Sequence, residues 1–152
     1  MEIEFEEIRP FGAVNSQDIK DFEESNEVIL PDDYKKFLEI QNGGRPKQNN
    51  LRLVETDVQW LYGMYDYENA PDWANFFEAL DTYEGRLPSW YIPIGQDSGG
   101  NVFIMSLYEE NRGVVAWWLH EQEAAQGNAD EYFDNVRVVA DNFTEFLKLL
   151  SD

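Results

Sequence analysis

The sequence predicts an α+β fold, in a single domain that contains about four helices and a set of hairpin-linked strands. A chain of 152 residues is the size of one ordinary domain and is long enough to bury a real core. Apolar residues at helical spacing occur towards both ends, whereas short β-branched and aromatic runs with turn signals occupy the middle. Helices that flank hairpin-linked strands are typical of α+β folds. Because no repeat or linker divides the chain, we treat residues 1–152 as one domain.

The first two helices are expected over residues 15–25 ("NSQDIKDFEES") and within residues 30–44 ("LPDDYKKFLEIQNGG"). In the first, Ser16 is the expected N-cap, and Ile19 and Phe22 lie three residues apart on one face. The second opens with a proline, whose fixed φ suits a first turn. Two aspartates follow it, where they favour the positive end of the helix dipole.

The other two helices are expected over residues 70–83 ("APDWANFFEALDTY") and 141–150 ("DNFTEFLKLL"). The former has apolar residues at helical spacing. The latter can be capped by Asp141 or Asn142. It is short, so its stability must come from packing.

Six short segments have the composition of strands and are bounded by turn signals: Leu51–Val54, Val58–Tyr62, Trp90–Ile94, Val102–Leu107, Val114–Leu119 and Val136–Val139. A turn at Asn111–Gly113 predicts that the fourth and fifth segments form an antiparallel hairpin. Trp117 and Trp118 are adjacent on one strand, so their side chains must point to opposite faces of the sheet.

The composition is strongly acidic. Thirty-one Asp and Glu residues face eleven Lys and Arg residues, which gives a formal net charge of −20. Such a surface repels nucleic acid and anionic lipid and attracts cationic partners, so neither nucleic acid nor a membrane is an expected partner. Solubility alone is an alternative reason for the charge. The acidic start, "MEIEFEEIRP", does not resemble a signal peptide, and no apolar run approaches 18 residues, so a cytoplasmic location is expected.

The glycine-rich stretch "GQDSGGNVFIMSL" (residues 95–107) fits none of the templates for a nucleophile, phosphate, dinucleotide or calcium loop. Instead, Asp97 is expected to accept backbone N–H bonds in a turn, and the two glycines allow positive φ. His120 is the only histidine and is expected on the surface, in an ion pair with Glu121. The chain has no cysteine, which excludes a thiolate nucleophile and a thiolate metal site. Because no catalytic template fits these residues, we predict no enzyme, no catalytic residue, no cofactor and no metal site.

Three blocks together resemble the SUKH superfamily of Smi/Knr-like proteins: "LPDDYKKFLEIQNGG", "IPIGQDSGGNVFIMSL" and the closing "FTEFLKLL". The resemblance implies a mainly antiparallel sheet packed against helices. It also implies a binding function. Bacterial members of the superfamily resemble immunity proteins that neutralise a toxin domain, frequently a nuclease. Eukaryotic relatives are non-enzymatic binding proteins of cell-wall regulation.

The charge and the resemblance together predict an immunity protein that binds a cognate toxin domain, such as a basic nuclease, and occludes its surface. The expected contact residues are Trp60, Tyr62, Asp66, Glu68, Asp97, Glu109 and Glu110. For the two aromatic residues, burial beneath a helix is the alternative. A general Smi/Knr-type interaction module without a toxin partner, and a carboxylate hydrolase with two acids in a deep pocket, are the competing functions.

Overall fold

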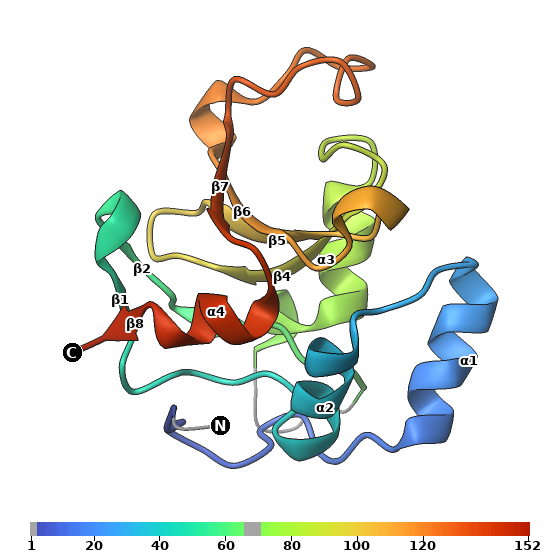
Figure 1. Ribbon diagram of the computed structural model, residues 1–152, viewed down its shortest axis with the longest axis vertical. Helices are drawn as coiled ribbons and strands as arrows, with labels where there is room; N and C mark the ends of the chain where they lie inside the picture. Colours follow the sequence, from blue (N-terminus) through green and yellow to red (C-terminus); the bar gives the residue numbers. More distant parts are fainter. Residues whose placement is uncertain (1–2, 66–70) are drawn as a thin grey trace.

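The computed structural model describes residues 3–65 and 71–152. Over these ranges the chain forms four α-helices and two antiparallel sheets (Figure 1). The larger sheet has the order β3-β4-β5-β6-β7, and the smaller one has the order β2-β1-β8. The predicted α+β class, with a mainly antiparallel sheet packed against helices, is confirmed.

The larger sheet consists of β3 (Trp60–Leu61), β4 (Tyr91–Gln96), β5 (Val102–Ser106), β6 (Val115–Trp118) and β7 (Val136–Ala140). The smaller sheet consists of β1 (Asn50–Leu51), β2 (Thr56–Asp57) and β8 (Leu150–Ser151). Three predictions were wrong here. The strand expected over Val58–Tyr62 is limited to Trp60–Leu61. Residues 52–54 form a 3-10 turn instead of extending the strand, and Leu150 lies in β8 rather than in the last helix. Its pairing with Leu51 of β1 ends the helical geometry there.

Helix α1 (Ser16–Asn26) has Asn15 as its N-cap, and the prediction that Ser16 is the cap was wrong. The Oδ1 of Asn15 accepts the backbone N–H of Asp18 at 2.9 Å, and the Asp18 carboxylate accepts the backbone N–H of Asn15 at 3.1 Å. This reciprocal capping box requires a side-chain acceptor three residues after the cap. Asp18 stands at that distance from Asn15, and this fixes the start of the helix.

The remaining helices are α2 (Asp32–Ile40), α3 (Phe76–Tyr83) and α4 (Phe143–Lys148). The Oδ1 of Asn142 caps α4 by accepting the backbone N–H of Glu145 at 2.8 Å, so Asn142 is the cap of the two candidates. The third helix starts later than predicted. Asn75 caps it by accepting two backbone N–H groups, and residues 72–74 form a separate 3-10 turn.

The central hairpin of β5 and β6 forms as predicted, with Phe103 opposite Trp117 and Val102 opposite Trp118. The two tryptophans point to opposite faces: Trp118 is buried and Trp117 is half-buried. Tyr83 of α3 packs edge-on against Trp118, and Phe146 of α4 packs against Phe103. Helices therefore cover both faces of the sheet, which is why all five residues of β5 are buried.

Candidate functional site

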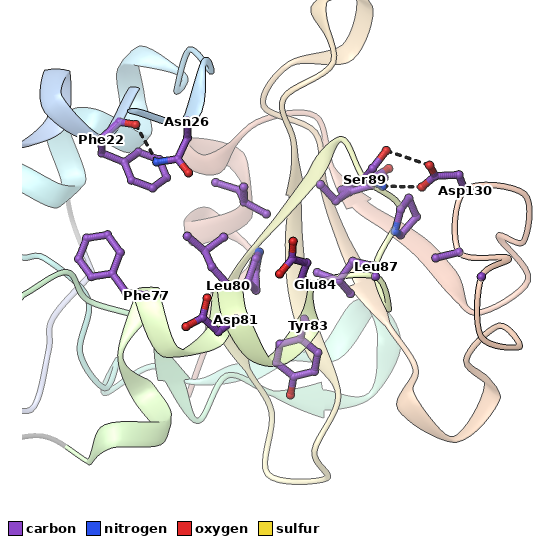
Figure 2. Close-up of a pocket in the computed structure, with 17 residues that line it drawn as sticks. Phe22, Asn26, Phe77, Leu80, Asp81, Tyr83, Glu84, Leu87, Ser89 and Asp130 are labelled. Atoms are coloured by element: carbon purple, nitrogen blue, oxygen red, sulfur yellow. Dashed lines mark hydrogen bonds between the residues drawn. The ribbon is translucent and has the colours of Figure 1, made fainter. Parts of the chain in front are cut away.

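A hollow of about 700 Å³ lies between α1, α3, the start of β4 and the loop around Asp130 (Figure 2). A second hollow of about 380 Å³ shares Phe22, Asn26 and Phe77 with it, so the two adjoin. We call them together the α1–α3 groove. Figure 2 shows Phe22 and Asn26 near one end of the main hollow and Ser89 with Asp130 at the other.

The α3 side of the groove follows from the helical repeat. Phe77, Leu80, Asp81 and Glu84 stand at positions i, i+3, i+4 and i+7, so one face of α3 and its C-terminal end carry them all. The cap at Asn75 fixes where this helix begins, and hence which residues face the groove.

The floor of the groove is apolar and aromatic. The Phe22 ring lies 6.1 Å from that of Phe77 and 5.4 Å from that of Phe76, measured between ring centroids. Leu80 and Tyr91 are only half-buried, so part of their apolar surface is open to the groove. Burial raises the pKa of the Tyr91 hydroxyl above its ordinary value, so this side chain is neutral at physiological pH.

The edge of the groove is negatively charged. Exposed carboxylates of Asp21, Asp81, Glu84 and Asp130 line it, and none of the described lining residues is basic. None of these four takes part in an ion pair described in the structure. Asp130 accepts hydrogen bonds from the backbone N–H and the hydroxyl of Ser89, at 2.6 and 2.9 Å.

Arg86, which lies in the sequence between the lining residues Gly85 and Leu87, is already engaged elsewhere. Its guanidinium donates to Glu123 at 2.9 Å and lies over the rings of Tyr83 and Trp118, 4.9 and 5.6 Å from their centroids. The hydrogen bond to Glu123 is the largest cause that raises the pKa of Arg86 above its ordinary value. The positive charge of Arg86 is therefore paired with Glu123 and does not neutralise the groove carboxylates.

Of the seven predicted contact residues, Trp60 is half-buried. Its ring packs edge-on against Phe11 and Trp73, and the guanidinium of Arg45 lies 5.8 Å from its centroid. Tyr62 is only 1% exposed. This burial corrects the expectation that Tyr62 lies on an open aromatic patch. Its hydroxyl donates to Gln96 at 2.9 Å, and desolvation raises its pKa well above the ordinary range.

Asp97 is also only 1% exposed, so the expectation of a surface contact is corrected there too. Its role in the turn is confirmed: Oδ1 accepts the backbone N–H groups of Gly99 and Asn101 at 3.0 and 2.8 Å. The other oxygen, Oδ2, accepts Thr56 Oγ1, Asn101 Nδ2 and Trp117 Nε1 at 2.8 to 3.0 Å. Five donors around one buried carboxylate make it a structural centre of the loop. Of the two glycines, only Gly100 has positive φ (+87°).

Glu109 and Glu110 are exposed on a 3-10 turn (Glu109–Asn111) after β5. Trp60 pairs with Gln96 at one end of β4. The turn follows Ser106 of β5, which pairs with Tyr91 at the other end of β4. Five residues of strand separate these ends by about 17 Å. Trp60 and the two glutamates therefore do not form one compact patch. Asp66 and Glu68 lie outside the described residues.

Next to that turn, Tyr108 is 52% exposed and Phe133 is 45% exposed, with the ring of Trp90 6.4 and 5.8 Å from theirs. This aromatic cluster was not predicted. His120 also differs from expectation, because no described ion pair includes it. Its Nε2 lies 3.0 Å from the carbonyl oxygen of Gly99, so the His120 side chain packs against the glycine turn.

The groove itself was missed from the sequence. A signal existed, because Phe77, Leu80, Asp81 and Glu84 share one helical face that is half apolar and half acidic. No group of three His, Cys, Asp or Glu side chains that could hold a metal occurs in the described ranges. Within those ranges, no helix has the length and apolar character that crossing a bilayer requires.

A comparison with curated proteins finds none that matches this chain. A comparison with known families matches residues 13–149, nearly the whole chain, to the family described as SMI1 / KNR4 family (SUKH-1). All three sequence blocks that carry the resemblance lie within the matched residues, apart from Leu150, the last residue of the final block. The chain therefore belongs to the SMI1/KNR4 (SUKH-1) family.

Proposed function

We propose that this protein is a non-enzymatic immunity protein that acts in the bacterial cytoplasm. It binds a basic toxin domain, of the nuclease class, and neutralises it by covering its cationic surface. The observation that supports this best is the α1–α3 groove, in which four exposed carboxylates surround an apolar floor on a chain of net charge −20. Membership of the SUKH-1 family supports a binding role.

The physical reasoning runs through the partner's chemistry. A nuclease must present cationic groups to hold phosphates, and an acidic protein can occupy that same surface. Long-range attraction then raises the association rate towards about 10⁸–10⁹ M⁻¹s⁻¹ at low salt. Slow dissociation requires apolar anchors shielded from water, which carry most of the affinity at protein interfaces. The groove offers both features in one place.

Contacts outside the groove extend this proposal. Glu109 and Glu110 are exposed beside Tyr108, and Trp60 is half-buried beside the exposed Trp73, so these positions are accessible to a partner. Asp66 and Glu68 belong to the same proposal from sequence alone. We expect the exposed acids to set the association rate and its salt dependence, while the aromatic groups slow dissociation.

The test is to co-express this chain with the C-terminal domain of a secreted toxin encoded by an adjacent gene. The expected result is restored growth and a 1:1 complex whose association rate falls as salt is raised. Failure to restore growth would contradict the proposal. If no toxin gene is adjacent and several cellular proteins bind with moderate affinity, the general interaction module is the better description.

A further inference from the structure

We propose that the α1–α3 groove docks a single basic segment of the partner. Apolar side chains of that segment lie on the Phe22–Phe77–Leu80 floor, and its Lys or Arg side chains meet the carboxylates along the edge. This inference rests on the proposed function and names the site and the chemistry of the segment it takes.

The floor explains why apolar side chains belong there. Leu80, Phe77 and Tyr91 are each half-buried, although their neighbours Phe22 and Ile92 are buried in the core. Incompletely covered aromatic and aliphatic groups in a hollow gain most from a partner that removes their remaining surface from water. An aromatic or branched aliphatic side chain is the group that fits such a floor.

The distribution of charge explains why the occupant is a segment and not one small cation. Asp21 lies on α1 in the second hollow, and Asp130 lies in the loop that bounds the far end of the main hollow. Asp81 and Glu84 lie between them on α3. Figure 2 shows Asp81 and Glu84 in the middle of the hollow and Asp130 at one end. Carboxylates spaced along a groove complement several cationic side chains on one chain.

Two of these carboxylates, those of Asp81 and Glu84, are also available. In the described structure, Asp81 and Glu84 have no hydrogen bond or ion pair to give up, and Arg86 is held by Glu123. A Lys or Arg from a partner therefore gains attraction without breaking an internal pair. A partner with acidic side chains would instead be repelled by the four carboxylates, none of which is in a described ion pair.

The first experiment uses a peptide probe, acetyl-KFKLKFK-amide, with ¹⁵N-labelled protein. We expect the largest amide shifts to fall on α1, α3 and residues 89–92. The matched probe acetyl-EFELEFE-amide has the same apolar residues and should give no shifts. Shifts that are spread over the surface, or centred away from the groove, would overturn the inference.

The second experiment separates the groove from net charge. The double variant Asp81→Lys/Glu84→Lys and the control Glu55→Lys/Asp141→Lys each move the net charge from −20 by +4 to −16. All four positions are exposed. Lysines near the C-terminal end of α3 suit the helix dipole, so the groove variant should keep its fold. Thermal unfolding of both variants checks this.

The groove variant should bind the basic peptide at least about tenfold more weakly than the unsubstituted chain, and the control less than about threefold more weakly. Equal weakening in both variants would mean that charge alone attracts the peptide, and the inference would be wrong. A toxin that the groove variant still neutralises with unchanged affinity would overturn the groove inference while the proposed function stands. Peptide binding in the groove without any toxin neutralisation would reject the proposed function alone.

Discussion

Replacing Asp97 by alanine tests whether the buried carboxylate holds the glycine turn in place. Five donors from four residues point at it: Gly99, Asn101 (twice), Thr56 and Trp117. The substitution removes the acceptor from all five at once. It also removes one negative charge from a chain of net charge −20, which by itself relieves repulsion. A loss of stability therefore has to come from the lost hydrogen bonds.

The size of the effect follows from which donors reach water afterwards. Gly99 is exposed, so its N–H can be solvated in the variant. The Trp117 Nε1 and the Asn101 backbone N–H are half-buried and keep much less access to water. Each buried donor without a partner costs about 1–3 kcal/mol, so two of them give about 4 kcal/mol of lost unfolding free energy. For a domain of this length, that corresponds to a Tm about 12 °C lower.

Urea unfolding followed by tryptophan fluorescence measures this loss, with an unchanged m-value as the sign that only stability has changed. Ser98→Ala is the matched control in the same loop. It removes one exposed hydroxyl hydrogen bond to Asp57 and should cost less than about 1 kcal/mol. If Asp97→Ala and Ser98→Ala lose similar amounts, the carboxylate is not the centre of the loop.

Three further substitutions probe single features of the fold. Asn15→Ala removes the α1 capping box and should lower the unfolding free energy by about 1 kcal/mol in urea titrations; no change would refute that role. Gly63→Ala would place a Cβ 2.1 Å from Phe11 Cδ2, so a loss of about 3 kcal/mol is expected, and a fully stable variant would contradict it. Tyr34→Phe removes a fully buried hydroxyl that has no partner among the described residues, so stability should hold or rise by about 1 kcal/mol. Burial raises the pKa of the Tyr34 hydroxyl in the folded protein. Above about pH 10 the hydroxyl therefore loses its proton in the unfolded chain but keeps it in the folded one, and the unfolding free energy falls as pH rises. The phenylalanine variant lacks this hydroxyl, so its unfolding free energy should fall less steeply.

The central hairpin could be predicted from the sequence because its signals are strong and local. Val102–Ser106 is a continuous apolar and β-branched run, and Gly113 supplies the positive φ that the connection needs. The smaller sheet could not be predicted, because two-residue strands carry no alternating pattern. Its strands β1 and β8 pair residues about a hundred positions apart, and tertiary contacts alone decide that pairing.

The candidate site was harder to predict than the fold. Exposure of Glu109 and Glu110 follows from their position in a connection. Tyr62 was misplaced because β3 ends at Leu61, so strand alternation does not extend to Tyr62, which is buried. The groove combines α1, α3 and a loop near residue 130. Since acids occur along the whole chain, their sequence positions do not reveal which four converge in space.

The docking of α4 and β8 against segments about a hundred residues earlier has a consequence for how the protein folds. The last helix brings Phe143 and Phe146 into the core, and Thr144 donates to Asp33 from 111 residues away. Until that helix docks, the partner surfaces of α2 and β5 stay uncovered. Such long-range closure slows folding, because the entropy of closing a long loop is lost before the contacts that it brings are gained. We therefore expect refolding of this protein to be limited by the docking of α4 against α2 and β5.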